Sequence, residues 1–415
     1  MNILVIGNGF DLAHGLPTKY TDFLEWIVAE VEFWEHLKMQ GREMANRIMS
    51  LPLILNIPED RKRKMDINST ISHQVELWDC INDNVWFEYF LQCDMHGDEN
   101  WIDFESEISE VIQTLDSDVR GNLYDIIHRL SINFLADKFL NHQNYIDNDG
   151  FMTEEERRNY VEKPPISFLE LRNILLRDLN KVIRALEIYL SDYVSELKIE
   201  GVLPEIKNIE INYVLSFNYT NTYEKIYGSG KDIEYEYIHG KANINNTINS
   251  NNMVLGIDEY LPDNRKNKDI EFIAFKKYFQ RIHKETGCKY KEWVDEIKTG
   301  YEKYQRRQND AWAEIIESFK DGSINQIPYQ KQVFCEKIQE ECPTHKLYIF
   351  GHSLDVTDGD ILRDLILNDN VYTTIYYLNK DVMGQQIANL VKVIGQDELI
   401  KRTGGSKKTI AFKKQ

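Results

Sequence analysis

Short apolar runs that end abruptly at glycine or asparagine restrict the fold of this chain more than any other feature. The three clearest runs, each with the residue that ends it, are 2–6 (NILVI) before Gly7, 212–217 (NYVLSF) before Asn218, and 346–350 (KLYIF) before Gly351. Brief runs without polar alternation are typical of parallel strands that helices cover on both faces. The sequence therefore predicts a parallel α/β sheet.

Two further runs are expected to extend this sheet. Residues 371–378 (VYTTIYYL) are rich in β-branched and aromatic side chains, and residues 253–257 (MVLGI) form another short apolar run. The segments between the strands show the helical spacing of apolar residues instead. These predicted helices cover residues 20–50, 121–141, 167–197 and 270–335.

The alternation of strands and helices predicts one interrupted sheet domain rather than a row of separate domains. We expect an α/β protein whose Rossmann-like parallel sheet carries large α-helical insertions. The predicted parts are a sheet domain at 1–20, 208–260 and 344–395, helical insertions at 21–207 and 261–343, and a basic C-terminal tail at 396–415.

Composition and charge exclude several classes of protein. Of the 415 residues, 42% are hydrophobic, which is enough for a large core and disfavours disorder. The formal charge of −19 argues against a nucleic-acid binder and against docking on anionic lipid. The chain has no apolar run long enough for a membrane span, no signal-peptide pattern and no CxxC pair. We expect a cytoplasmic protein with reduced thiols.

The first predicted strand ends in a glycine loop. Gly7 and Gly9 give a GxG pattern, but Leu12 stands where GxGxxG has its third glycine. Glycines after a first strand allow the backbone to approach a phosphate, and a following helix N-terminus favours negative charge. A tight turn leaving the strand is the alternative interpretation.

Three other strand ends carry polar residues suited to a site. Asn218 follows a buried strand, where its alternative role is a helix cap. His239 follows an aromatic, β-branched run, and histidine is the usual proton-transfer group near neutral pH, although a structural role is the alternative. Ser353 is suited to donate to a phosphate or ribose, or to cap a helix. Parallel strands place their following loops on one sheet edge, so these residues are expected to converge.

An acidic cluster follows the strand at 346–350. Asp355, Asp358 and Asp360 are oxygen ligands of the kind that Mg²⁺ prefers, which would suit a nuclease. Acidic residues are also favoured at helix starts by the helix dipole. We favour the helix start and expect no metal.

The order of the motifs identifies a family resemblance. The chain contains, in order, GNGFDLAHGLPTKYTDF, WIDFE at 101–105, SFNYTNTYEKIYG, YIHG, LGID and FGHSLDVTDGDIL. This set resembles the AbiH family of bacterial proteins linked to abortive infection by phage, and it spans essentially the whole chain. The resemblance implies a role in anti-phage defence. It assigns no role to Trp101, Asp103 and Glu105.

A more distant resemblance is to the sirtuin-like NAD-binding fold, which has a glycine loop, a strand-end Asn, an HG pair and a GTSL loop in the same order. It implies NAD, or a related nucleotide, as substrate or ligand. The implied catalytic residues are Asn218, His239 and Asp11, and the implied cofactor-binding residues are Gly7, Asn8, Gly9, Phe10, Pro17, Gly240, Gly351, His352 and Ser353. Asp11 and Thr220 depart from the sirtuin Ser and Asp, and the sirtuin zinc module is missing, so NAD consumption is implied rather than deacetylation.

The combined expectation is an abortive-infection effector that hydrolyses NAD at the nicotinamide–ribose bond. Cleavage passes through an oxocarbenium-like state. Asn218 would orient the ribose or the water, His239 would act as general base, and Asp11 would bind the ribose or stabilise positive charge. The alternative is a nucleotide-sensing or partner-binding defence protein without turnover, acting through a homo-oligomer or a phage-derived trigger.

Overall fold

The computed structural model describes residues 1–39, 67–96, 103–117, 168–199, 201–320, 341–405 and 408–415. The predicted helix at 121–141 and the residue Trp101 lie outside this range, as do residues 40–50 and 321–335 of two other predicted helices. Contacts divide the chain into two units, which are described separately. The sheet unit comprises Met1–Gly15, Glu200–Ile238 and Thr286–Gln415, and the helical unit comprises Leu16–Ile199 and His239–Glu285.

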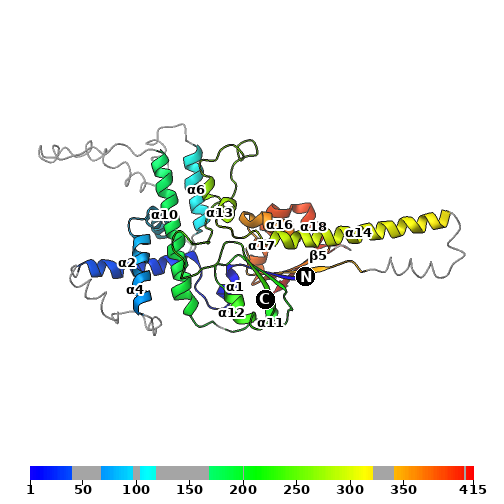
Figure 1. Cartoon of the computed structure of the whole chain (residues 1–415), viewed down its shortest axis with the longest axis horizontal. Helices are drawn as coiled ribbons and strands as arrows, with labels where there is room; N and C mark the ends of the chain where they lie inside the picture. The colour runs from blue at the N-terminus through cyan, green and yellow to red at the C-terminus, as the bar shows by residue number, and fades with distance from the viewer. Residues whose placement is uncertain (40–66, 97–102, 118–167, 200, 321–340, 406–407) are drawn as a thin grey trace. The chain divides into compact units, whose positions relative to one another are not determined.

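The sheet unit is built on six parallel strands (Figure 1). They are β1 (Asn2–Ile6), β2 (Tyr213–Ser216), β3 (Glu234–Tyr237), β4 (His345–Phe350), β5 (Val371–Tyr377) and β6 (Ile410–Lys414). Their order is β3-β2-β1-β4-β5-β6, and every neighbouring pair is parallel. This is the strand order of doubly wound dinucleotide-binding sheets. The predicted α/β class with a Rossmann-like sheet is therefore confirmed.

The continuous apolar run of β1 follows from its central place in the sheet. Successive side chains of a strand point to opposite faces. Ile3 and Val5 accordingly join one core cluster, whereas Leu4 and Ile6 join the other. All four side chains are at most 2% exposed, so neither face of this strand tolerates a polar residue.

Helices cover both faces of the sheet. One core cluster takes residues from α14 (Tyr290–Lys320), α16 (Gly359–Ile366), α17 (Lys380–Ile394) and α18 (Gln396–Thr403). The other takes residues from α1 (Asn8–Ala13), α11 (Pro204–Lys207) and α12 (Thr222–Tyr227). The sheet is thus the middle layer of a three-layer unit, which is the arrangement that fully buried parallel strands require.

The C-terminal segment is part of the sheet unit. Residues 396–415, interpreted from the sequence as a basic tail, contain α18 and the edge strand β6. Ile410 of β6 is 1% exposed and pairs with Thr373. Arg402 of α18 is buried and donates hydrogen bonds to the carbonyl oxygen of Leu367 and to the carboxylate of Asp369, both over 2.9 Å. Arg402, one of the basic residues of this segment, therefore has a structural role.

The described part of the helical unit packs five long helices. They are α2 (Tyr20–Met39), α4 (Ile67–Ile81), α5 (Val85–His96), α6 (Phe104–Ser117) and α10 (Phe168–Ile188). After α10 the chain continues through the π-helical turn Tyr189–Tyr193 and the 3₁₀ turn Val194–Glu196, so the predicted helix at 167–197 is confirmed. The rings of Phe90 and Phe104 stack with centroids 4.0 Å apart in the aromatic core of this unit.

The predicted strand at 253–257 was wrong. Met253, Val254 and Leu255 are buried, but the segment belongs to the helical unit, where its one bridge joins Ile257 to Lys276. Lys276 lies in the link between the 3₁₀ turn Ile273–Phe275 and α13 (Lys277–His283). An apolar run of five residues indicates that the segment is buried, but a buried segment need not pair with a neighbouring strand.

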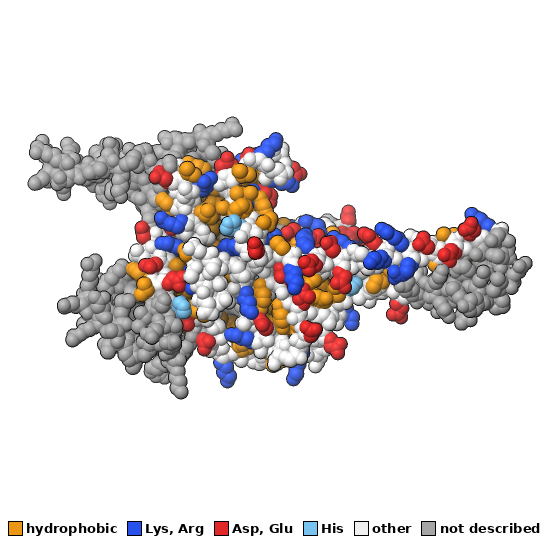
Figure 2. Space-filling model, viewed as in Figure 1, with side chains coloured by type: hydrophobic (Ala, Val, Ile, Leu, Met, Phe, Trp, Pro, Cys, Tyr) orange, Lys and Arg blue, Asp and Glu red, His pale blue; other side chains and the backbone are white. Residues whose placement is uncertain are grey.

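The surface of α14 mixes charges of both signs. Figure 2 shows acidic and basic side chains interspersed along this helix, where Glu302 and Arg306 form one ion pair. Alternating charge along a helix face is typical of a solvent-exposed surface. None of the helices that the structure describes combines the length and the apolar character that crossing a bilayer requires.

Candidate functional site

The candidate site lies at the carboxyl ends of β1, β2 and β4 in the sheet unit. The chain leaves β1 into α1, which packs on one face, and leaves β4 toward α16, which packs on the other. β1 and β4 are neighbours, so the direction of winding reverses between them. In open α/β sheets, ligands bind outside the carboxyl ends of the strands at such a reversal point. The topology therefore places the GNG and GHS motifs where a nucleotide is expected.

Three glycines allow the loops after β1 and β4 to touch through their backbones. The amide nitrogen of Gly7 donates to the Phe350 oxygen over 3.2 Å, and that of Gly9 donates to the Gly351 oxygen over 2.8 Å. A Cβ atom on Gly351, whose φ is +66°, would lie 2.2 Å from the amide nitrogen of Phe10. The contact between the loops thus requires glycine at these positions. Their predicted phosphate contacts stay a prediction.

Asn218 ties the loop after β2 to the loop after β1. Its Nδ2 atom donates to the carbonyl oxygen of Gly7 over 3.0 Å, and its backbone amide donates to the Ser216 hydroxyl over 3.2 Å. The side chain is buried, with 5% exposed. The cap position of α12 is held by Asn221, without a side-chain capping bond. Asn218 is therefore a strand-end residue that bridges loops, and not the helix cap that the sequence also allowed.

Asp11 is a buried carboxyl group next to these loops. The hydroxyl of Thr220 donates to its Oδ2 atom over 2.6 Å, and the hydroxyl of Thr222 donates to that of Thr220 over 3.1 Å. Its Oδ1 atom has no hydrogen-bond partner among the described residues. Burial raises the pKa of Asp11 to about 6, although the side chains of Thr220, Thr222 and Asn218 act to lower it. This carboxyl group can gain or lose a proton near neutral pH.

The loop after β4 is held from within the sheet unit. The His352 side chain is buried, and its Nδ1 atom accepts a hydrogen bond from the Leu354 amide over 2.9 Å. Its Nε2 atom lies 3.6 Å from the carboxylate of Asp358. Asn389 donates to the carbonyl oxygen of Ser353 over 3.0 Å, whereas the Ser353 side chain is exposed. Of the predicted ligands in this loop, Ser353 is the one with a hydroxyl open to a solute.

Two other predicted ligands of the first loop occupy different environments. The Phe10 side chain is fully buried and packs against Phe350 with ring centroids 5.9 Å apart. Asn8 is half-buried at the start of α1. Phe10 therefore contributes its backbone and core packing at this edge of the sheet, and Asn8 is the more accessible of the two.

His14 is a buried residue that the sequence analysis missed. Its Nδ1 atom donates to the carbonyl oxygen of Phe10 over 2.7 Å, so its Nε2 atom accepts from the Tyr227 hydroxyl over 3.0 Å. The Tyr227 oxygen in turn accepts from the Leu203 amide over 2.8 Å. Burial lowers the pKa of His14, which keeps the ring neutral. The spacing of four residues from Phe10 to His14 on a short helix was the signal for this contact.

The acidic residues after β4 start a helical turn. Asp355 precedes the 3₁₀ turn Val356–Asp358, and its carboxylate accepts a hydrogen bond from the Thr357 amide over 3.1 Å. Capping of this kind is the ordinary role of Asp before a helical turn. Among the described residues, no group of three or more His, Cys, Asp or Glu side chains is arranged to hold a metal ion.

The remaining predicted site residues belong to the helical unit. His239 is buried, and its carbonyl oxygen accepts from the Val254 amide over 2.8 Å. Gly240 has a φ of +79°, and a Cβ atom there would lie 2.2 Å from the carbonyl oxygen of Asn252. The Pro17 oxygen accepts a hydrogen bond from the Tyr189 hydroxyl over 2.7 Å. The positive φ and the close approach to Asn252 thus require glycine at position 240.

The WIDFE motif has structural roles at the start of α6. The Asp103 carboxylate accepts from the Glu105 amide over 3.1 Å and from the Ser106 hydroxyl over 2.8 Å, which caps the helix. Glu105 forms an ion pair with the buried Lys277 over 2.6 Å. These contacts account for two residues to which the motif alone gave no role.

Comparison with known proteins gives one match. A family model described as bacteriophage abortive infection AbiH matches residues 3–377, a range that includes residues of both units. Comparison with curated proteins and comparison with solved structures give no match. The matched range covers most of the 415 residues. The chain therefore belongs to the AbiH family of bacteriophage abortive infection proteins.

Proposed function

We propose that this chain acts in abortive infection by hydrolysing NAD at the nicotinamide–ribose bond, with the dinucleotide bound at the carboxyl edge of the sheet unit. The observation that carries the proposal is the buried Asp11 carboxyl group beside Asn218 and Thr220. It lies next to the point where the winding of the sheet reverses, which is where dinucleotides bind in sheets of this strand order.

The proposed reaction breaks one bond and forms one. The bond from the ribose anomeric carbon to the nicotinamide nitrogen breaks, and nicotinamide leaves as a neutral molecule with the bonding electrons. A water oxygen bonds to the same carbon and gives up a proton, leaving ADP-ribose. The transition state carries positive charge on the sugar ring, which a nearby carboxylate stabilises.

Each residue has a proposed task in this reaction. Asp11, ionised above a pH of about 6, binds the ribose or stabilises the developing positive charge. Asn218 orients the ribose through its amide oxygen, since its Nδ2 atom is bound to Gly7. His239 is assigned as a general base from the YIHG motif and its resemblance to the sirtuin HG pair.

The direct test is nicotinamide release from NAD by the purified full-length chain, followed by chromatography. We expect release by the wild type and its loss in Asp11→Asn and Asn218→Ala. The matched control is Asp397→Asn, because Asp397 is exposed in the first turn of α18. Full activity in folded Asp11→Asn and Asn218→Ala would refute the proposed site. In cells, the corresponding measurement is NAD content during phage infection.

Nucleotide sensing without turnover is the second candidate. It is favoured by Asp11 and Thr220, which stand where the sirtuin-like motifs carry Ser and Asp. In this case a homo-oligomer or a phage-derived trigger would respond to the bound nucleotide. Calorimetry that detects NAD binding while chromatography detects no nicotinamide, with the phage trigger present, would favour this function over hydrolysis.

A further inference from the structure

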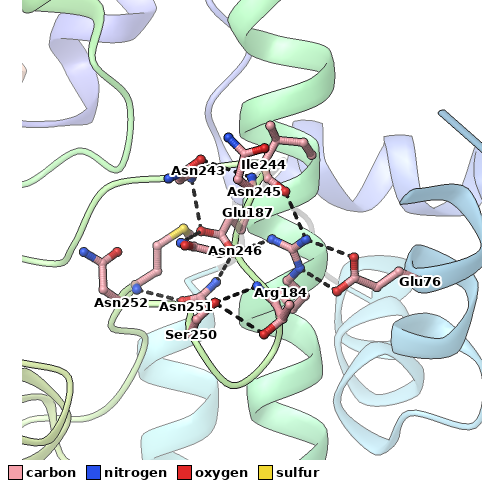
Figure 3. Close-up of polar contacts among 12 residues, drawn as sticks. Glu76, Arg184, Glu187, Asn243, Ile244, Asn245, Asn246, Ser250, Asn251 and Asn252 are labelled. Carbon is pink, nitrogen blue, oxygen red and sulfur yellow. Dashed lines mark hydrogen bonds and ion pairs between the residues drawn. The ribbon is translucent and has the colours of Figure 1, made fainter. Parts of the chain in front are cut away.

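A buried charge network joins two helices of the helical unit (Figure 3). Glu187 and Arg184 of α10 are at most 1% exposed, and Arg184 Nη1 lies 2.6 Å from Glu187 Oε2. Arg184 also donates to both carboxylate oxygens of Glu76 on α4, over 2.8 and 2.9 Å. A carboxylate without exposure to water is stable as an ion only when charged and polar donors surround it.

The other donors to Glu187 come from one loop, residues 241–252, which we call the asparagine loop. Glu187 Oε1 accepts from the backbone amide of Asn243 over 3.1 Å and from the side-chain amide of Asn246 over 2.7 Å. Glu187 Oε2 accepts from the side-chain amide of Asn251 over 2.5 Å. Figure 3 shows the side chains of Asn246 and Asn251 and the backbone amide of Asn243 directed at the carboxylate. The buried carboxylate of Glu187 therefore binds three residues of the asparagine loop.

Both ends of the asparagine loop form hydrogen bonds close to His239 and Gly240. At one end, the amide of Lys241 donates to Asn252 Oδ1 over 3.3 Å. At the other end, Asn251 Oδ1 accepts from the Met253 amide over 2.7 Å. The next amide, that of Val254, donates to the carbonyl oxygen of His239 over 2.8 Å. A displacement of the loop would thus be transmitted to His239 through two short backbone links.

We propose that Glu187 is a positioning residue that fixes the backbone of His239 and Gly240 through the asparagine loop, with Arg184 paired to its carboxylate. The inference rests on the proposed function for the role of His239 in NAD hydrolysis. The anchoring of the loop is independent of that role. Glutamine at position 187 would turn an amide group toward donors, so at least one of the bonds from the loop is lost.

The first test is hydrogen exchange of the full-length chain, with Glu187→Gln compared with Glu259→Gln. Glu259 is a matched control because it pairs with the buried Lys276 in the same unit, over 2.7 and 2.9 Å, and its hydrogen bonds in the described part of the chain go to Lys276 and Leu261 rather than to the asparagine loop. We expect amides of residues 241–254 to exchange at least about tenfold faster in Glu187→Gln only. Equal exchange in the two variants would overturn the anchoring.

The second test asks whether the effect passes through His239. In nicotinamide release, Glu187→Gln should lower kcat at least about tenfold while KM changes little, and it should have no further effect on the residual activity of His239→Ala. An equal loss in both backgrounds would overturn the positioning role, because general damage adds to the loss of His239. Full activity of His239→Ala would refute the proposed function of His239, and the exchange result would then decide the anchoring by itself.

A variant with a smaller expected effect tests the inference if Glu187→Gln fails to fold. Asn251→Ala removes one donor to Glu187 and the acceptor of the Met253 amide, and it leaves the pair of Glu187 and Arg184 intact. We expect its exchange rate and kcat to lie between those of the wild type and Glu187→Gln. Wild-type exchange and kcat in Asn251→Ala would overturn the inference that the loop transmits the effect.

Discussion

The side-chain amide of Asn218 donates a hydrogen bond to the carbonyl oxygen of Gly7 over 3.0 Å, so a residue after β2 holds the loop after β1. Replacing Asn218 with Ala removes this donor inside a buried region. We expect the free energy of unfolding to fall by about 1–3 kcal/mol, as for other buried hydrogen bonds. Denaturant unfolding measures the change, and an unchanged midpoint would show that the bond contributes nothing.

Gly351→Ala should be among the most destabilising single-methyl changes in the chain. The added Cβ atom would lie 2.2 Å from the Phe10 amide, and the φ of +66° is costly for alanine. We expect a loss on the order of 3 kcal/mol or more. The control is Gly384→Ala inside α17, where no atom beyond the neighbouring residues and the backbone of the helix itself lies within 4 Å of the added group. That variant should gain about 0.5–1 kcal/mol in the same unfolding experiment.

The buried Asp11 carboxyl group should make stability fall as pH rises. Its pKa is raised from 3.8 to about 6, so between these values the folded chain holds a proton that the unfolded chain releases. Stability from this group is therefore present below a pH of about 4, and it is lost as pH rises to about 6. The loss is on the order of 3 kcal/mol.

Asp11→Asn tests this pH dependence because it has no proton to lose. Relative to the wild type, the variant should be more stable at pH 7 than at pH 4.5, with the difference developing mainly over this interval. Denaturant unfolding of both proteins across the range gives the measurement. A constant difference at every pH would contradict the raised pKa.

Tyr227→Phe should destabilise the sheet unit although it removes one oxygen only. That oxygen joins His14 to the Leu203 amide, and both groups lose their partner when it is absent. We expect a loss of about 1–3 kcal/mol. Tyr372→Phe is the control, since Tyr372 is 48% exposed on β5. Thermal unfolding should separate the two variants, and equal melting temperatures would disprove the relay from His14 to Leu203.

Removal of residues 405–415 should damage the sheet rather than trim a tail. The truncation removes β6 together with the buried side chain of Ile410, and it leaves the edge of β5 without its paired strand. Open, unpaired edges favour association between chains. We expect a lower melting temperature and aggregation in size-exclusion chromatography. The double variant Lys413→Ala and Lys414→Ala keeps the strand and removes the charge, and it should behave like the wild type.

The central strands were predictable from their apolar runs, whereas β6 was not predicted and only the aromatic run before His239 pointed to β3. β1 is buried from Ile3 to Ile6, and β4 places Leu347, Ile349 and Phe350 in the two core clusters, so their runs are mostly apolar. β3 (EYEY) is half-buried along its length, and β6 (IAFKK) ends in exposed lysines, because each has a neighbour on one side only. Neither gives the apolar run on which the prediction depended.

The position of the candidate site was predictable from the sequence, whereas the contacts of its residues were not. The order of motifs located Gly7, Asn218 and Gly351, and parallel pairing brought their strand ends to one edge. The burial of Asp11 against Thr220 could not be foreseen, because the two residues are far apart in the chain and meet only through the fold. The same reason hid the contacts of Glu187, whose loop partners lie more than 50 residues along the chain.

The strand order also determines when the strands can pair while the chain is being synthesised. β1 is made first, yet its two neighbours in the sheet begin at Tyr213 and His345, and the last strand ends at Lys414. Pairings between residues so distant in the chain form late. A ribosome carrying an unfinished copy therefore displays β1 without β4, and the reversal point between them is absent. Any activity that depends on this edge, including the proposed NAD hydrolysis, therefore requires a chain that extends past β4.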